Sequence, residues 1–272
     1  MGNTTMPHPI NCGTYSYTML SFVEACGHIA ANGFGGVYAH SFRTERSGGA
    51  PLPVAEARRA FADLGLTPTV AMSGSPNLKV GVDAAVDRYR KLADAGTALG
   101  IRWMQDCDVL LDERDAYVDV VRRAADYAES KGMAITMKPH GGFAMTIADL
   151  IDIHERVNHP AFGICLDPGN IIYYSVGEHR PETDLAELAP LVTTVIVKDC
   201  VIRDGEPDVM IVPGEGLVDF ETVFGTLFDA GFDGPFSVEK VPGKSVDELD
   251  ANFRLALQFI RKQLERCAAS GG

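Results

Sequence analysis

The chain has 272 residues, of which 46% are hydrophobic and 22% are charged, which is sufficient for one domain with a large buried core. Its 37 Asp and Glu residues outnumber its 24 Lys and Arg residues and give a formal net charge of -13 at pH 7. This charge repels phosphate backbones and anionic lipid surfaces, so the composition argues against nucleic acid and membrane partners.

Short apolar runs alternate with longer amphipathic segments along the chain. The runs are apolar almost throughout, which is typical of parallel strands covered on both faces. The longer segments have the spacing of apolar residues that predicts helices. The eight expected strand and helix pairs are 9–13 with 17–32, 35–39 with 53–64, 67–72 with 81–99, 101–105 with 112–131, 134–137 with 146–157, 162–166 with 181–188, 193–197 with 219–230, and 235–238 with 246–266.

Eight consecutive strand and helix repeats favour the α/β class and closure into a single (β/α)8 TIM barrel over an open sheet. The expected domain spans residues 1–272, with a core from about 9 to 266. In such barrels the functional residues gather at the C-terminal ends of the strands. The residues that follow each apolar run are therefore candidates for the functional site.

Cysteine usage and the lack of long apolar segments are used to predict the cellular compartment of the protein. The six cysteines are scattered without a CxxC pair, and several lie in apolar runs, where a reduced thiol packs as a small hydrophobe. Residues 1–9 contain no apolar stretch of signal-peptide length, and no segment approaches the roughly 18 apolar residues of a membrane helix. We expect a cytoplasmic protein, and apolar helical faces would permit a homo-oligomer.

The expected strand ends are rich in hydroxyl, amide and charged side chains. In chain order they are Thr14 and Tyr15; Tyr38, His40 and Arg43; Ser73 and Asn77; Gln105, Asp106 and Asp108; Lys138 and His140; Asp167 and Asn170; Lys198 and Asp199; and Glu239 and Lys240. Ionisable groups at the ends of buried strands are costly to hold unless they face a shared polar cavity. We take that cavity, with Lys138, His140, Asp167 and Glu239 at its centre, as the candidate active site.

Several sequence strings resemble those of a known family. They are GF-G-V at 33–37, CLDPGN at 165–170, VKD at 197–199, GEGLVDF at 214–220 and GPFSVEK at 234–240. With these strings the chain resembles the xylose isomerase-like barrel superfamily of sugar isomerases and epimerases, from about Ile10 to Leu264. The strings KPHGG at 138–142 and DPGNI-YY-G at 167–177 resemble a subgroup of it.

The resemblance implies a divalent metal held by a Glu on the fifth strand, an Asp on the sixth, a His on the seventh and a Glu on the eighth. The two Glu residues of that family also move a proton between neighbouring carbons of a sugar. Asp167 and Glu239 match this set, whereas Lys138 replaces the fifth-strand Glu and Ile196 replaces the seventh-strand His. His140 matches a histidine that the family often carries two residues beyond the fifth-strand Glu.

Three interpretations of this altered metal site stay open. In the first, the Lys138 ammonium takes the place of the cation, holds Asp167 and Glu239 together, and stabilises an enolate oxygen. In the second, Lys138 forms a Schiff base with a keto sugar. In the third, a divalent metal such as Mn, Mg, Co or Zn is bound by His140, Asp167 and Glu239, with positions left open for substrate. Nearby carboxylates keep an amine protonated, which favours the first interpretation.

Under the first interpretation, Glu239 is the base that removes a proton next to a carbonyl. His140 is the acid or hydrogen-bond donor, and Lys138 stabilises the enediolate. The expected substrate-binding residues are Asp167, Asn170, Lys198, His40, Tyr15 and Gln105. The expected partner is a small sugar, polyol or sugar-like substrate, with an unphosphorylated one slightly preferred because no phosphate clamp is visible.

Other functions fit the same residues. The enolate could expel a β-substituent, which would make the protein a lyase or dehydratase instead of an isomerase or epimerase. Lys138 and Glu239 could form only a buried ion pair that fixes the barrel, in a non-catalytic descendant that binds a polyol or a partner protein. A DNA-repair endonuclease of related fold is disfavoured, because the chain has few strand-end histidines and is strongly acidic.

Overall fold

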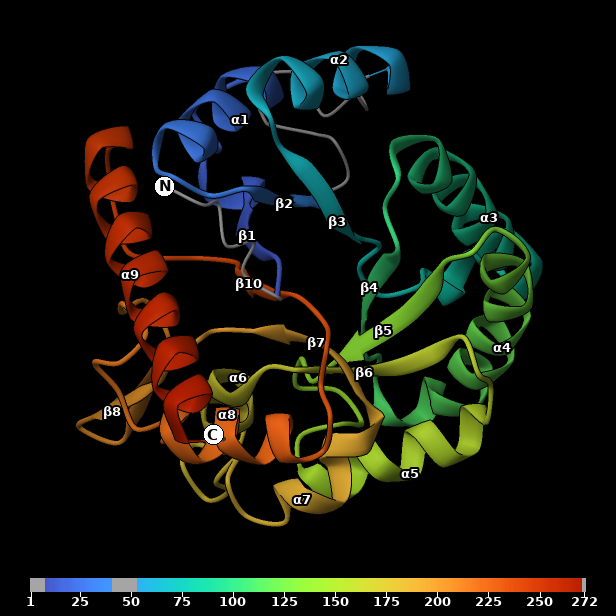
Figure 1. Cartoon of the computed structure of the whole chain (residues 1–272). Coiled ribbons are helices and arrows are strands. Elements are labelled where there is room, and N and C mark those ends of the chain that lie inside the picture. Colours follow the sequence, from blue (N-terminus) through green and yellow to red (C-terminus); the bar gives the residue numbers. More distant parts are fainter. Residues whose placement is uncertain (1–7, 41–52, 271–272) are drawn as a thin grey trace.

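A computed structural model describes residues 8–40 and 53–270 of the chain. Eight parallel strands form a closed barrel in the order β1-β10-β7-β6-β5-β4-β3-β2, and helices surround it (Figure 1). The expected (β/α)8 barrel is therefore confirmed. The barrel strands are β1 Ile10–Gly13, β2 Gly36–His40, β3 Thr67–Met72, β4 Trp103–Cys107, β5 Ala134–Lys138, β6 Phe162–Leu166, β7 Val192–Ile196 and β10 Phe236–Val238.

The helices that follow the strands begin where the sequence supplies capping residues. The helices are α1 Phe22–Ala31, α2 Val54–Leu64, α3 Val82–Leu99, α4 Arg114–Ser130, α5 Ile147–Val157, α6 Pro168–Tyr174, α7 Leu185–Leu188, α8 Phe220–Asp229 and α9 Val246–Ser270. Ser21 and Glu24 form a capping box at the start of α1, and Thr146 and Asp149 form another at α5. Asp219 caps α8 by accepting a hydrogen bond from the Thr222 amide.

Three local expectations differ from the structure. The first helix begins at Phe22 instead of residue 17, because Thr14–Ser16 forms a turn of 3-10 helix and Ser21 caps the helix. The helix expected at 181–188 is confined to α7, and α6 begins directly after β6 with proline in its first turn. The chain after β7 also forms an antiparallel hairpin, β8 Val201–Arg203 and β9 Glu206–Asp208, which the apolar pattern does not indicate.

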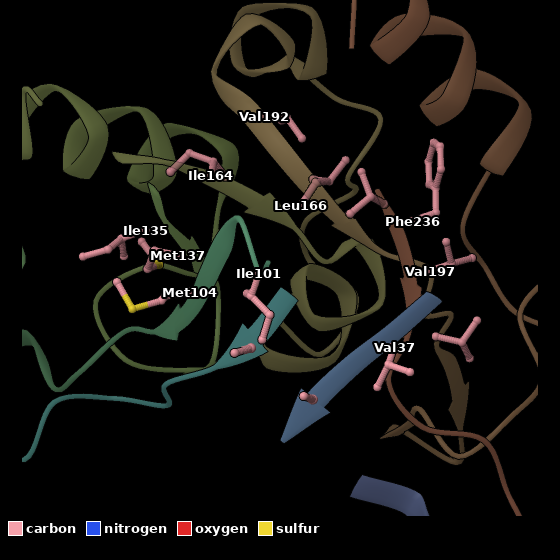
Figure 2. Close-up of a cluster of buried hydrophobic side chains, with 14 of the residues drawn as sticks. Val37, Ile101, Met104, Ile135, Met137, Ile164, Leu166, Val192, Val197 and Phe236 are labelled. Atoms are coloured by element: carbon pink, nitrogen blue, oxygen red, sulfur yellow. The ribbon is translucent and has the colours of Figure 1, made fainter. Parts of the chain in front are cut away.

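Strand alternation separates two kinds of buried side chain. Ile135 and Met137 of β5 belong to the main apolar core, which also contains Met104 and Ile164, as Figure 2 shows. The alternate residues of β5, Thr136 and Lys138, are also buried but polar. This alternation directs every second residue of a barrel strand into the barrel, so Lys138 lies one step above Thr136 towards the C-terminal mouth.

Two further features follow from the described part of the chain. None of its helices combines the length and the apolar character needed to cross a bilayer. All six cysteines are free thiols, and five of them are buried.

Asp106 of β4 is a fully buried carboxyl group outside the candidate site. The Tyr89 hydroxyl donates to its Oδ2 at 2.6 Å, and the Cys107 amide donates to its Oδ1 at 2.8 Å. Burial raises the pKa of Asp106 to about 7, since the loss of water outweighs the stabilising hydrogen bonds.

We predict that Asp106→Asn raises the free energy of unfolding, relative to the wild-type protein, more at pH 8 than at pH 5. The folded state holds an extra proton between the unfolded pKa of about 3.9 and the folded pKa, so the wild-type protein loses stability as the pH rises through about 7. The amide keeps an acceptor for the Cys107 amide and carries no charge. Urea unfolding at both pH values measures the effect, with the exposed Asp233→Asn as the control. A variant-to-wild-type difference that does not change with pH would contradict it.

Candidate active site

Four charged side chains meet at the C-terminal mouth of the barrel, and we call them the charge tetrad: Lys138, Asp167, Lys198 and Glu239. Lys138 ends β5, and the other three follow β6, β7 and β10. Lys138 Nζ lies 2.7 Å from Glu239 Oε1 and 3.9 Å from Asp167 Oδ2. Lys198 Nζ lies 2.8 Å from Asp167 Oδ2 and 2.7 Å from Glu239 Oε2. Each carboxylate therefore faces two ammonium groups.

Burial makes this pairing necessary. Lys138 is 1% exposed, Asp167 is 0%, Glu239 is 6% and Lys198 is 7%. Desolvation of a lone charge at this depth would cost on the order of several kcal/mol. Two positive and two negative groups in mutual contact cancel one another and so make the burial tolerable.

The protonation of the tetrad follows from the same contacts. Burial alone would lower the pKa of Lys138, but the charges of Glu239 and Asp167 raise it well above its usual value. Burial alone would raise the pKa of Glu239, yet Lys138 and Lys198 hold it well below the usual range. Lys138 is therefore an ammonium and Glu239 a carboxylate at neutral pH.

Asn170 anchors Lys198 and Asp167 through the first turn of α6. Its side-chain oxygen accepts from Lys198 Nζ at 3.2 Å, and its amide nitrogen donates to the Pro139 carbonyl at 2.8 Å. Its backbone amide donates to Asp167 Oδ1 at 3.1 Å, which makes Asp167 the N-cap of α6. Gly169 is required between them, because a Cβ there would lie 2.8 Å from the Lys198 carbonyl oxygen.

Asp199 positions the loop that follows the hairpin. Its carboxylate accepts hydrogen bonds from the amides of Gly214, Gly216 and Val218 at 2.8 to 3.0 Å, and from that of Cys200 at 2.9 Å. The GEGLVDF segment is thereby tied to the end of β7, next to Lys198.

The tetrad borders a cavity of about 340 Å³ that opens at the barrel mouth. Lys198 and Glu239 belong to its lining, whereas Lys138 and Asp167 do not. Tyr15, His40 and Lys240 line the side formed by β1, β2 and β10. His140, Asn170, Tyr173 and Tyr174 line the side formed by β5 and β6, which lies across the barrel from β1 and β2. The wall is completed by Met72, the last residue of β3, and by Val209 and Met210, just beyond the hairpin.

The two histidines of the cavity differ in their neighbours but not in the direction of their pKa shift. Partial desolvation lowers the pKa of His40, which packs against Tyr15 with ring centroids 4.6 Å apart. Partial desolvation and then the charge of Lys138 lower the pKa of His140, which packs against Tyr174 at 5.6 Å. Both imidazoles are therefore mainly neutral at pH 7.

The structure brings together most of the residues expected to act. Gln105 is the exception, because it is 0% exposed inside the barrel and lies outside the cavity lining; its oxygen is 3.8 Å from the Cys165 thiol. Arg43, another strand-end candidate, lies outside the described residues. No sequence pattern indicated Val209 and Met210, which directly follow the unexpected hairpin. Lys240 was identified only as a strand-end residue, without a role.

The chain is similar to several proteins of known name. It is 25% identical over 163 residues to an inosose dehydratase of Geobacillus thermodenitrificans, and the match spans 56% of this chain and 55% of that protein. The chain thus spans about half the length of the curated relatives it matches.

Similar folds occur among solved structures. The D-allulose 3-epimerase of Methylomonas sp. in complex with D-allulose is 18% identical, with a TM-score of 0.75 over 94% of this chain and 97% of that one. A xylose isomerase-like TIM barrel protein of Mycobacterium smegmatis in complex with magnesium is 16% identical, with a TM-score of 0.75 over 96% of this chain and 98% of that one. At these identities the likeness establishes the fold.

We predict that Lys138→Met destabilises the fold by about 3 to 5 kcal/mol, because it leaves the Glu239 carboxylate buried with one ammonium fewer. Urea unfolding measures this effect, and the exposed Lys262→Met on α9 is the charge-matched control. In the double variant Lys138→Met/Glu239→Gln, part of the loss should be recovered because the charge left by the lysine is also removed. Strict additivity of the two substitutions would argue against the coupling.

The family match agrees with the barrel and with the strings in the sequence. The sequence profile described as xylose isomerase-like TIM barrel matches residues 26–263. This range begins within α1 and ends within α9, so it includes every barrel strand except β1 and all four members of the charge tetrad. The chain belongs to the xylose isomerase-like TIM barrel family.

Proposed function

We propose that this protein is an isomerase or epimerase that removes a proton from the carbon next to a carbonyl of a sugar, polyol-derived ketone or similar substrate. The observation that carries the proposal is Glu239, a carboxylate on the cavity wall whose two oxygens contact the ammonium groups of Lys138 and Lys198. A base directly beside two fixed cations suits a reaction that develops negative charge on a neighbouring oxygen.

In the proposed reaction, Glu239 takes the proton, the electron pair of the C–H bond forms a carbon–carbon double bond, and the π pair of the carbonyl group moves to its oxygen. The resulting enediolate oxygen accepts a hydrogen bond from Lys198, the tetrad ammonium that lines the cavity. Lys138 acts from behind Glu239 through its charge, because it is fully buried. Return of a proton to the neighbouring carbon, or to the opposite face of the same carbon, completes isomerisation or epimerisation.

Lys198 links substrate binding to the strength of the base. Its ammonium has three protons, and Asp167, Asn170 and Glu239 accept all three in the ligand-free protein. A substrate oxygen can gain a hydrogen bond from Lys198 only by displacing one of them. If Glu239 is displaced, it loses a stabilising contact and its pKa rises, so that it becomes a stronger base as the carbonyl becomes polarised.

His140 stands on the opposite side of the cavity, beside Tyr174 and Asn170. A neutral imidazole there can donate a proton or a hydrogen bond to a substrate oxygen while Glu239 acts on carbon. His40 and Tyr15 bound the other side and would contact substrate hydroxyls. With His140 on one side of the substrate and His40 and Tyr15 on the other, the reacting carbon would lie above Lys198.

A dehydratase reaction is the second candidate, because it shares every step as far as the enolate. The enolate would then expel a β-hydroxyl group, with His140 supplying the proton that the leaving oxygen needs. The similarity to an inosose dehydratase favours this candidate, whereas the fold shared with an allulose epimerase supports the first.

The remaining interpretations of Lys138 are less consistent with the geometry. A Schiff base needs a neutral amine, but the contacts with Glu239 and Asp167 keep Lys138 protonated. For a metal, Asp167 and Glu239 would have to exchange the shared Lys198 ammonium for the cation. Within residues 8–40 and 53–270 no cluster of three or more His, Cys, Asp or Glu side chains is arranged to hold a metal. The donor set therefore does not fit a metal in this arrangement, and we derive no step through one.

We predict that Glu239→Gln reduces deuterium incorporation into substrate by about 10² to 10⁴-fold, the usual contribution of a general base. The protein is incubated in D2O with D-allulose, an inosose or 2-keto-D-gluconate, and exchange at carbon is followed by NMR; elimination appears as loss of the hydroxyl. Glu265→Gln, on the exposed face of α9, is the matched control. Exchange that persists in Glu239→Gln at the wild-type rate would reject the base assignment, and exchange absent from the wild-type protein would favour a non-catalytic binding role.

We also predict that chelation leaves the protein unchanged. After dialysis against EDTA, the melting temperature and the exchange rate should equal those of untreated protein, and elemental analysis should find less than one equivalent of Mn, Mg, Co or Zn. A loss of activity restored by one of these ions would show that the tetrad rearranges to bind it.

A further inference from the structure

We propose that the substrate carries an anionic group, a carboxylate or a phosphate, which binds to Lys240 on the β10 side of the cavity. This inference rests on the proposed function and names the class of substrate. A carboxylate would agree with the slight preference for an unphosphorylated substrate that the sequence suggested, whereas a phosphate would depart from it. Of the described residues that line the cavity, Lys240 carries the one ammonium that the tetrad does not neutralise.

Lys240 follows Glu239 directly, so its side chain leaves the backbone beside the tetrad without joining it. It is half-buried and belongs to the cavity lining. Its ammonium lies 4.5 Å from the centroid of the Tyr15 ring, which is within the range of a cation–π contact. Among the described residues no carboxylate forms an ion pair with it, whereas both Lys138 and Lys198 have two.

Among the residues that the structure describes, the charges lining the cavity do not balance. The two tetrad lysines are cancelled by Asp167 and Glu239, so within this set Lys240 leaves one positive charge in excess. The protein as a whole carries a net charge of -13. A local positive excess in the pocket of an acidic protein is therefore specific to that pocket, and it would attract an anion by focusing the field inside the cavity.

The free-energy cost of charging Lys240 also favours an anionic ligand. Removal of water and the nearby charges of Lys198 and Lys138 disfavour its charged form, and Glu239 only partly compensates; its pKa is lowered as a result. Holding an ammonium in this environment costs stability in the ligand-free protein. A substrate anion would provide the missing partner, and the contact would be charge-assisted.

The position of Lys240 fits a bound anion at the far end of a small substrate. The reacting carbon is placed above Glu239 and Lys198, and Lys240 lies with Tyr15 and His40 on the side away from His140. A cavity of about 340 Å³ is at the lower end of the range for small-molecule sites, about 300 to 1,000 Å³. It suits a molecule of hexose size with its carbonyl over the tetrad and its anionic end against Lys240.

Binding of three matched probes to the full chain tests the proposal. D-Fructose is neutral, 2-keto-D-gluconate carries a carboxylate and D-fructose 6-phosphate carries a phosphate. Titration calorimetry at low salt should give an affinity for at least one anion that is about ten-fold higher than for fructose, the factor expected for one charge-assisted hydrogen bond. Whichever anion binds more tightly identifies the group that Lys240 prefers, and a preference for either one supports the proposal.

Variants locate the anion. Lys240→Met should remove the ten-fold preference, whereas Lys240→Arg should keep most of it, and the thermal unfolding of each ligand-free variant shows that it is folded. Lys244→Met, which makes the same change of charge four residues away and outside the cavity lining, is the matched control and should keep the full preference. Added salt should weaken the anions more than fructose.

The proposal is overturned if fructose binds as tightly as both anions, if none of the three probes binds, or if Lys240→Met and Lys244→Met reduce the preference equally. These outcomes are separate from those of the deuterium experiment. If exchange depends on Glu239 but is as fast with neutral ketones as with anionic ones, the proposed function stands and the anion site fails. If anions bind at Lys240 without exchange, the site stands and the reaction fails.

Discussion

The cancellation of four desolvated charges is the constraint on which this active site depends. Lys138 and Asp167 are buried as deeply as any side chain of the apolar core, and Lys198 and Glu239 are only slightly more exposed. None of them would be tolerated alone, because each would shift its pKa or draw water into the barrel. Together they form a closed set in which each carboxylate and each ammonium has two partners of opposite sign.

The same cancellation shapes the proposed chemistry. The two ammonium groups that depress the pKa of Glu239 make it a weak base in the ligand-free protein. They also stabilise the oxygen on which negative charge develops. This stabilisation of the transition state offsets the lower basicity of Glu239 in the ligand-free protein. A divalent cation would act on both Glu239 and the substrate oxygen with a single ion. Here the two positions belong to two lysines: Lys138 lies behind Glu239, and Lys198 faces the cavity.

The sequence was sufficient for the barrel, and for those site residues that strand periodicity places. Apolar runs followed by polar residues predicted all eight barrel strands within a few positions, because parallel strands buried on both faces carry a strong signal. The α6 helix and the hairpin were missed because both are short: α6 begins at a Pro-Gly pair that reads as a turn, and the hairpin strands have three residues each. Short elements are stabilised by tertiary contacts, which leave little local pattern.

Lys198 shows more clearly what a sequence pattern cannot predict. The sequence marks Lys198 as a strand-end residue and a substrate-binding candidate, but a charged pair such as Lys198 and Asp199 at the end of a strand is also typical of a solvated edge. The structure separates the two neighbours: Lys198 turns inward to Asp167 and Glu239, and Asp199 accepts hydrogen bonds from the Cys200 amide and from three amides of the loop beyond the hairpin. Alternation fixes the side of a strand on which a residue lies, but not the partner that its long side chain reaches.

The uneven distribution of charge connects the site to the rest of the molecule. An acidic surface disfavours anions in general, while a pocket with one unmatched ammonium favours them locally. A neutral sugar would gain nothing from that ammonium and would leave it desolvated and unpaired. An anionic substrate pairs with it, and its carbonyl then lies over Lys198 and Glu239. Substrate selection and orientation would thus come from one interaction at Lys240, separate from the tetrad to which we assign the proposed chemistry.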